Sequence, residues 1–188
     1  MRDAGWLDAS RLERDALYLG LLTAREVKPL SRLEYSISNN LYRILVEMGL
    51  KLARLTRRAQ NGATVPHLVM SLDRRRIADY LAEFDGAVIV GNSPAVIRAE
   101  ARHFGYPACC AESFSRRGYA PNDLEPADQR ILFHHACAGC TETPPLLPAY
   151  RAACEESERL FRRQAHPKAP GACVNRAKGT NHDTGRSL

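Results

Sequence analysis

The chain has 188 residues, of which 45% are hydrophobic, and a net charge of +6. This length predicts one globular domain, and no apolar run reaches the roughly 18 residues that a membrane span requires. The charged N-terminal segment lacks the apolar stretch of a secretory signal, so we expect a cytoplasmic protein without a membrane partner. Because thiols stay reduced in the cytoplasm, the six cysteines need not form disulfides.

Half of the net positive charge lies in residues 165–188, which contain four basic residues and one aspartate. This segment has no apolar periodicity, so we expect a disordered basic tail after a globular domain at residues 1–164. Arginine clusters also occur at residues 54–58, 74–76 and 116–117. Such clusters are typical of solvated helix faces. The alternative is a surface that binds nucleic acid or an anionic substrate.

Two helices are predicted in the first third of the chain. Residues 8–20 have an apolar face, and a second helix begins at Ser31, whose spacing from Glu34 forms a capping box. The apolar residues of this second helix recur at helical intervals. The turn signal Asn61-Gly62 is expected to end it near residue 60.

The middle of the chain changes character. Residues 63–72 and 86–91 are short, apolar and rich in β-branched residues, and residues 73–84 between them have helical periodicity. This order predicts a right-handed crossover between two parallel strands. We therefore expect an α+β or small α/β fold. It has a helical N-terminal half, a small parallel sheet of two or three strands and a helical C-terminal part that carries the cysteines.

A glycine turn joins the second predicted strand to the next helix, which runs from Pro94 to Phe104. The turn consists of Gly91, Asn92 and Ser93, with Ser93 as the helix cap. Free backbone N–H groups at such junctions bind anions and nucleotides in α/β folds, so these three residues are a candidate cofactor-binding turn. An ordinary capped strand–helix junction is the alternative.

Four cysteines follow in two pairs. A short helix is expected to begin near residue 107, with Cys109 and Cys110 in its first turn, where the helix dipole lowers the pKa of a thiol. Cys137 and Cys140 have the Cys-x-x-Cys spacing that directs two thiolates at one metal ion. Four thiolates from two segments suffice for a metal ion or for an iron–sulfur cluster. All four cysteines are therefore candidate metal ligands.

The adjacency of Cys109 and Cys110 bears on the identity of the metal. Neighbouring helical residues point about 100° apart, so the two thiolates would more easily bind two irons of one cluster than a single ion. The pair resembles the tandem cluster ligands of the quinone-proximal subunit of respiratory complex I. It also resembles the CC…CxxC pattern of heterodisulfide-reductase cluster domains, although Ala111 replaces the glycine that normally follows. We expect an iron–sulfur cluster, with zinc as the alternative.

Two histidines precede the second pair of cysteines. A helix predicted at residues 127–136 carries His134 and His135 in its last turn, beside Cys137. Either histidine is a candidate acid–base group, and in a metal-free thiol enzyme it would activate one of the upstream cysteines as nucleophile. Ordinary surface or core histidines are the alternative.

The last predicted helix covers residues 149–164. Its Cys154 lies among glutamates and is expected to serve packing, because cysteine behaves as a small apolar residue in protein cores. Cys173 is expected to be a free thiol in the tail.

A family resemblance covers about residues 86–141. It rests on the run Gly105-Tyr106-Pro107-x-Cys109-Cys110-x-x-x-Phe114 with a Cys-x-x-Cys downstream. This motif resembles that of a prokaryotic domain-of-unknown-function family, number 483. The resemblance implies no established reaction, but it supports Cys109 and Cys110 as the centre of the site.

Three functions remain open from the sequence. The first is a small iron–sulfur enzyme that acts on an unidentified small-molecule or anionic substrate. The second is a zinc-bearing module that binds nucleic acid or another partner. The third is a metal-free enzyme with a cysteine nucleophile at position 109 or 110.

Overall fold

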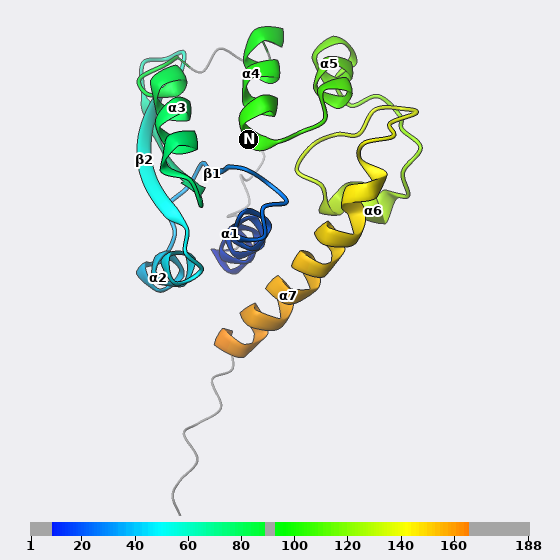
Figure 1. Cartoon of the computed structure of the whole chain (residues 1–188). Helices are drawn as coiled ribbons and strands as arrows, with labels where there is room; N and C mark the ends of the chain where they lie inside the picture. The colour runs from blue at the N-terminus through cyan, green and yellow to red at the C-terminus, as the bar shows by residue number, and fades with distance from the viewer. Residues whose placement is uncertain (1–8, 89–92, 166–188) are drawn as a thin grey trace, which may run out of the picture.

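The computed structural model describes residues 9–88 and 93–165 (Figure 1). Within these ranges the chain forms seven α-helices, one short 3-10 helix and one three-stranded sheet. The predicted α+β class, with helical N-terminal and C-terminal parts, is confirmed. The expected tail after residue 165 lies outside the described residues. None of the helices described is long and apolar enough to cross a membrane.

The sheet has the strand order β1-β3-β2, and both of its pairings are antiparallel. Strands β2 (Lys51–Arg58) and β3 (Thr64–Ser71) form a hairpin, and the short β1 (Ser31–Leu33) pairs with the other edge of β3. The prediction of a parallel sheet is therefore wrong. The short connection between β2 and β3 allows only an antiparallel return, because a parallel return needs a long crossover.

The second predicted strand, residues 86–91, approaches the sheet at one described position. Val88 forms an isolated parallel bridge with Arg58 of β2, and the Arg58 N–H donates to the carbonyl of Ala87 at 2.9 Å. Residues 89–92 lie outside the described part of the chain. The start of the second predicted strand therefore lies next to β2, but within the described residues it contributes one bridge and not a strand.

The long helix predicted from Ser31 to residue 60 is also wrong. Its residues form β1, the short helix α2 (Asn39–Glu47) and β2. The apolar residues at helical spacing belong to α2. Ser38 is the N-cap of this helix, and its side chain accepts a hydrogen bond from the Leu41 N–H. Gly49, at φ +86°, lies just beyond α2, in a conformation that glycine adopts without strain.

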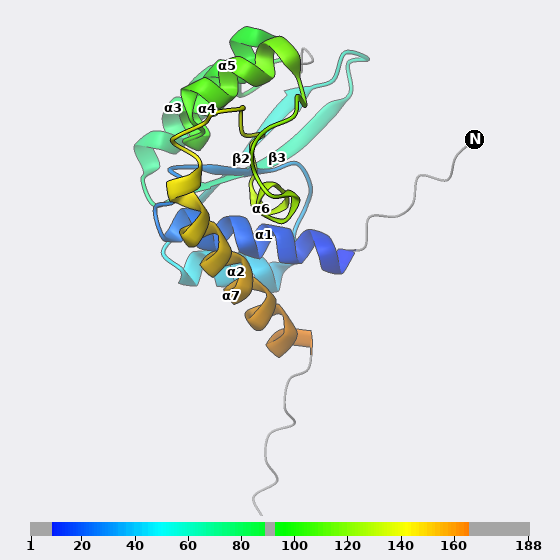
Figure 2. The same ribbon diagram turned by 90° about the vertical axis from the view of Figure 1, so that its right-hand side faces the viewer.

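Helices cover both faces of the sheet (Figures 1 and 2). On one face, α3 (Arg74–Phe84) and α4 (Pro94–Phe104) pack in a core with Val69 of β3. On the other face, α1 (Ala9–Ala24) and α2 pack in a core with Met70. Val69 and Met70 are adjacent, and successive side chains of a strand point to opposite faces. The helices predicted at 73–84 and 94–104 are confirmed, and the one at 8–20 corresponds to α1.

The C-terminal part consists of α5 (Ala108–Arg117), α6 (Pro126–Ile131), the 3-10 helix Pro144–Leu146 and α7 (Leu147–Ala165). Helix α7 packs against α1 and crosses it at an angle, as Figure 2 shows. Tyr150 of α7 and Tyr18 of α1 belong to the same core, and the Tyr18 hydroxyl also donates to the carbonyl of Ile131 at 2.7 Å. These contacts hold the segment between α6 and α7 at a fixed place beside α5.

Candidate metal centre

The first pair of cysteines lies where α5 begins. Helix α4 ends at Gly105, which has φ +70°, and the chain turns through Pro107 into α5. Cys109 and Cys110 are therefore in the first turn of α5, as predicted. Cys109 is exposed, whereas Cys110 is buried.

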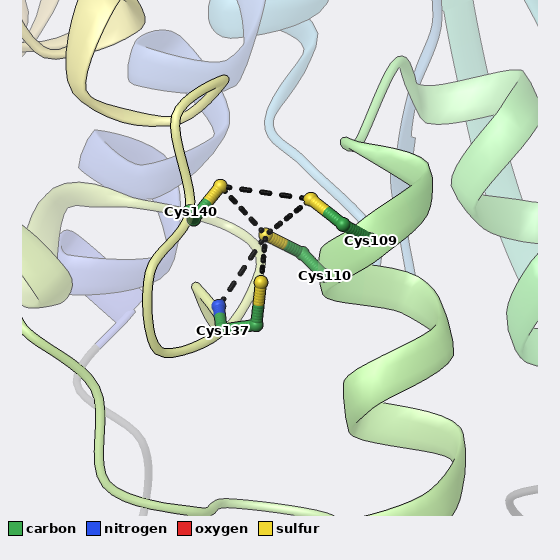
Figure 3. Close-up of side chains that lie close together, drawn as sticks. All are labelled: Cys109, Cys110, Cys137 and Cys140. Atoms are coloured by element: carbon green, nitrogen blue, oxygen red, sulfur yellow. Dashed lines mark hydrogen bonds between the residues drawn. The ribbon is translucent and has the colours of Figure 1, made fainter.

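The second pair of cysteines forms a tight turn after α6. The Cys140 N–H donates to the Cys137 carbonyl at 3.2 Å, and Gly139 between them has φ +69°. The Gly139 N–H donates to the Asp123 carboxylate at 2.6 Å, which fastens the turn to the preceding loop. The turn is thus held by local backbone geometry, and it directs both sulfurs toward α5 (Figure 3).

The two pairs meet to form one cluster of four sulfur atoms (Figure 3). All four sulfurs lie within 4.8 Å of one another. Cys110 is the central member, because its Sγ lies 3.4 Å from that of Cys140 and 3.9 Å from those of Cys109 and Cys137. The remaining close separation, between Cys109 and Cys140, is 3.7 Å. These distances exceed the roughly 2 Å of a disulfide, and all four cysteines are free.

The adjacency of Cys109 and Cys110 does not keep their sulfurs apart. Their Cα positions are separated by one helical step, for which two irons of one cluster were expected to suit the pair better than a single ion. The 3.9 Å between the two sulfurs shows that side-chain rotation brings them together. Adjacency in the sequence therefore does not by itself disfavour a single ion at this pair.

Hydrogen-bond donors surround the inner sulfurs. The Cys137 N–H donates to Cys110 Sγ at 3.4 Å, and the Thr143 N–H donates to Cys140 Sγ at 3.3 Å. The fully buried Thr143 hydroxyl also lies 3.2 Å from Cys140 Sγ and 3.5 Å from Cys110 Sγ. Donors of this kind stabilise thiolates, which are the form that binds metal.

The pKa values of the thiols differ because their environments differ. Burial acts to raise the pKa of Cys140, but its hydrogen bonds with the Thr143 side chain and backbone outweigh burial and lower this pKa to about 7. Burial raises the pKa of Cys110 to about 11, despite its bonds from Thr143 and Cys137. Burial and the neighbouring thiols also raise the pKa of Cys109. In the absence of a cation, the cluster therefore resists carrying four negative charges at once.

The two histidines lie in a loop rather than in a helix. Helix α6 ends at Ile131, because Leu132 has an extended backbone, so the helix predicted to residue 136 is too long. His134 and His135 are not members of the four-sulfur cluster. His134 is buried, and its Nε2 lies 3.0 Å from the Thr143 hydroxyl, which in turn contacts the sulfurs. His135 donates from its Nε2 to the Ala120 carbonyl.

The environment of His134 keeps its ring neutral. Burial is the main cause that lowers its pKa, to about 4. The ring packs against Tyr106 at a centroid distance of 5.2 Å. His134 therefore touches the sulfur cluster through Thr143 and has no direct bond to a cysteine among the contacts described.

The remaining sequence predictions concern other segments. Gly91 and Asn92 lie outside the described residues, and Ser93 stands at the N-cap of α4 without a side-chain capping bond. A ligand at this turn stays a prediction. Cys154 packs against the core between α1 and α7, as expected, and Cys173 lies outside the described residues.

Thr143 is the functional residue that the sequence interpretation missed. It follows Cys140 by three positions, so its N–H can return to the cysteine sulfur within one tight turn. A hydroxyl residue three positions after a metal-binding cysteine is a local signal that could have identified it. Its contact with His134 depends on the folded loop and has no such signal.

The arrangement as a whole is compatible with a metal-binding protein. A cation would remove the repulsion among the four thiolates, and the surrounding N–H groups and the Thr143 hydroxyl would hold them in place. No protein-family model, curated protein or solved structure matches the chain, so its function has to be inferred from the geometry of this site.

Proposed function

We propose that the protein binds one zinc ion through Cys109, Cys110, Cys137 and Cys140. The spacing of the sulfurs carries this proposal. Thiolates at about 2.3 Å from a tetrahedral zinc ion lie about 3.8 Å from one another. The four closest sulfur separations here run from 3.4 to 3.9 Å.

An iron–sulfur cluster fits this spacing less well. In a cubane each thiolate binds a different iron at a different corner, which holds the sulfurs about 6 Å apart. The sulfurs here all lie within 4.8 Å of one another. A single iron ion would fit the same distances, but zinc is the ordinary occupant of a closed four-cysteine site.

The role that this site supports is structural. Four protein thiolates fill all positions of a tetrahedral ion, which leaves none open for a substrate or for a reactive water. The ion would join the first turn of α5 to the loop that leads into α7, and so connect two segments that are about 30 residues apart. Any reaction of this protein would then take place beside the metal centre and not at it.

Metal analysis tests the proposal directly. Protein purified under anaerobic conditions, without added metal, is analysed for zinc, iron and acid-labile sulfide, and the metal-free protein is then titrated with Co²⁺. We expect one zinc per chain, little iron, and a cobalt complex with the intense thiolate absorption of a tetrahedral site. If the protein instead contained iron and an equal amount of acid-labile sulfide, the site would bind an iron–sulfur cluster and the zinc proposal would be wrong.

The metal-free alternative has its own signature. This alternative was expected to use Cys109 or Cys110 as nucleophile, but burial raises the pKa of both thiols. Cys140, with a pKa of about 7, should instead react fastest with iodoacetamide near pH 7 in protein that contains no metal. We expect instead that zinc protects all four cysteines from alkylation, and that a chelator abolishes this protection. Cys154, which lies outside the cluster, provides the internal reference.

A further inference from the structure

Two neighbouring cavities lie beside the proposed metal centre. The larger, of about 420 Å³, is bordered by Cys110 and His134, and the smaller, of about 90 Å³, is bordered by Lys28 and Ser31. The two share four lining residues: Arg32, Phe104, Tyr106 and Phe133. Because the two cavities share these walls, they lie side by side as a narrow inner part and a wider aromatic part.

Lys28 is a buried lysine that borders the inner part. Its side chain is 1% exposed, and its amine donates to the Phe104 carbonyl at 3.2 Å. The Nζ atom lies 4.0 Å from the centre of the Tyr106 ring. Its hydrogen-bond partner is thus a carbonyl and not a carboxylate, and burial lowers the pKa of Lys28 well below its usual value. A neutral amine carries the lone pair that a nucleophile requires.

The choice of lysine at this position is itself informative. The chain contains 27 basic residues, of which only four are lysines. The two other basic side chains that are largely buried nearby are arginines, Arg32 and Arg57, and both bind the carboxylate of Glu100. Arginine stays charged in proteins, whereas a buried lysine can lose its proton. Lysine at position 28 therefore provides chemistry that arginine cannot.

Arg32 gives the site a group that recognises an anion. It borders both cavities, and its guanidinium carbon lies 5.4 Å from the centre of the Phe104 ring, as does the Lys28 amine. Arg32 and Arg57 share the carboxylate of Glu100, and Arg32 also binds the exposed Glu34. Within the described part of the chain, Arg32 uses three of its five N–H groups, for Tyr80, Glu100 and Glu34, so two remain to donate to a ligand carboxylate.

A buried polar atom in the larger cavity also lacks a partner. His134 is 9% exposed, and its Nδ1 makes no hydrogen bond within the described part of the chain. Buried polar atoms are normally paired, so an unpaired one beside a cavity indicates a missing ligand or water. Together with the aromatic walls, it marks the wider part as space for the body of a small molecule.

We propose that this site binds a small 2-oxo carboxylate and that Lys28 condenses with its keto group. The ligand carboxylate lies on Arg32, and its side chain occupies the aromatic part of the site. The Lys28 nitrogen attacks the keto carbon and forms a C=N bond, while the keto oxygen leaves as water with the two amine protons. This step needs no oxidant, reductant or metal, so it is independent of the proposed role of zinc.

Reductive trapping tests the proposal. The full-length, zinc-loaded protein is incubated near pH 7 with phenylpyruvate and cyanoborohydride, which reduces an imine to a stable secondary amine, and modified peptides are mapped by mass spectrometry. We expect one adduct per chain, on Lys28, with the exposed Lys51 at least tenfold less modified. Phenyllactate, which has no keto group, should give no adduct. Equal modification of both lysines, or no adduct on Lys28, would overturn the proposal.

Two variants and one control locate the groups involved. Lys28→Met should abolish the adduct, whereas Lys51→Met should leave it unchanged. Arg32→Gln should lower trapping of phenylpyruvate at least tenfold and that of the uncharged phenylacetaldehyde much less, because only the former has a carboxylate. An equal effect on both compounds would remove Arg32 from the recognition site. The map of the wild-type protein decides the Lys28 step even if Lys28→Met does not fold, and zinc content is read separately on every sample.

Discussion

The Thr143 hydroxyl lies 3.2 Å from the Cys140 sulfur, and the backbone N–H of the same threonine donates to that sulfur at 3.3 Å. One residue therefore contacts a single thiolate twice. The same hydroxyl also lies 3.0 Å from His134 Nε2, so it links the sulfur cluster to the wall of the neighbouring cavity. Contacts of this kind orient metal ligands and keep them deprotonated.

Replacement of Thr143 by valine should weaken zinc binding. Thr143→Val keeps the shape and the backbone donor but removes the hydroxyl, so the pKa of Cys140 should rise from about 7. We expect a roughly 10- to 100-fold lower zinc affinity, measured by competition with a chromophoric chelator. The matched control is Thr141→Val, because Thr141 is exposed in the same loop. An equal loss in both variants would show that the hydroxyl has no specific role.

Replacement of the central cysteine should remove the metal. Cys110→Ser is expected to lose stoichiometric zinc and to lower the free energy of unfolding by about 3 kcal/mol or more, because metal binding contributes directly to folding. Cys109→Ser should act in the same direction. Cys154→Ser is the control, since its sulfur lies outside the cluster. Zinc content and urea unfolding give the two readouts, and similar losses in all three variants would contradict the proposed centre.

The cysteine cluster was predictable because its signals are local. A Cys-x-x-Cys turn and a pair of cysteines at a helix start are both set by a few neighbouring residues, and the structure brings all four together. The two pairs are about 30 residues apart in the sequence, which does not tell how far apart they lie in space. Only the fold shows that the sulfurs are close enough for one ion. Lys28 has no local signature, because its burial depends on Phe104 and Tyr106, far along the chain.

The sheet was predicted less well than the helices. In β2, Leu55 and Arg57 are buried while Thr56 and Arg58 are exposed, which is strand alternation. This segment follows α2 closely, and its arginines and leucines also suit a helix, so periodicity alone extended the helix into it. With β2 taken as helix, residues 63–72 were paired with residues 86–91 instead, and the helix between those two segments predicted a parallel pair. Helix α3 was found from the helical spacing of its apolar residues, and α4 because Pro94 begins it and Gly105 follows its last residue.

The αL glycine at the end of α4 should tolerate no side chain. A Cβ at Gly105 would lie 2.5 Å from Pro29 Cδ, and the φ of +70° already disfavours any other residue. We expect Gly105→Ala to lower the free energy of unfolding by about 2 kcal/mol or more in urea titrations. Gly86→Ala separates the two effects, because Gly86 has φ +72° but no atom within 4 Å of its Cβ position. Equal losses would assign the whole cost to φ.

The carboxylate of Glu100 should be essential for stability, because it is the shared partner of two largely buried arginines. It accepts from Arg57 at 2.6 Å and also from Arg32, and Arg57 is 4% exposed. Glu100→Gln keeps the shape but leaves two guanidinium groups without their shared countercharge. We expect a loss of about 3 kcal/mol in unfolding free energy. Glu47→Gln, which breaks an exposed ion pair with Arg43, should change stability far less. A small effect at Glu100 would mean that water compensates these arginines.

His67 should make the fold sensitive to acid. It is 3% exposed, and neither ring nitrogen has a partner in the described part of the chain. Burial lowers its pKa, and the charge of Arg32 lowers it further. In the unfolded chain histidine binds a proton near pH 6.5, so below that pH the unfolded state binds more protons and stability falls.

His67→Leu should therefore be as stable as the wild type at pH 7 or more stable, and should lose less free energy of unfolding between pH 7 and pH 5. Both zinc-loaded proteins share the thiolate centre, so its protonation cancels in their difference. Parallel pH dependences would show that His67 does not titrate in this range.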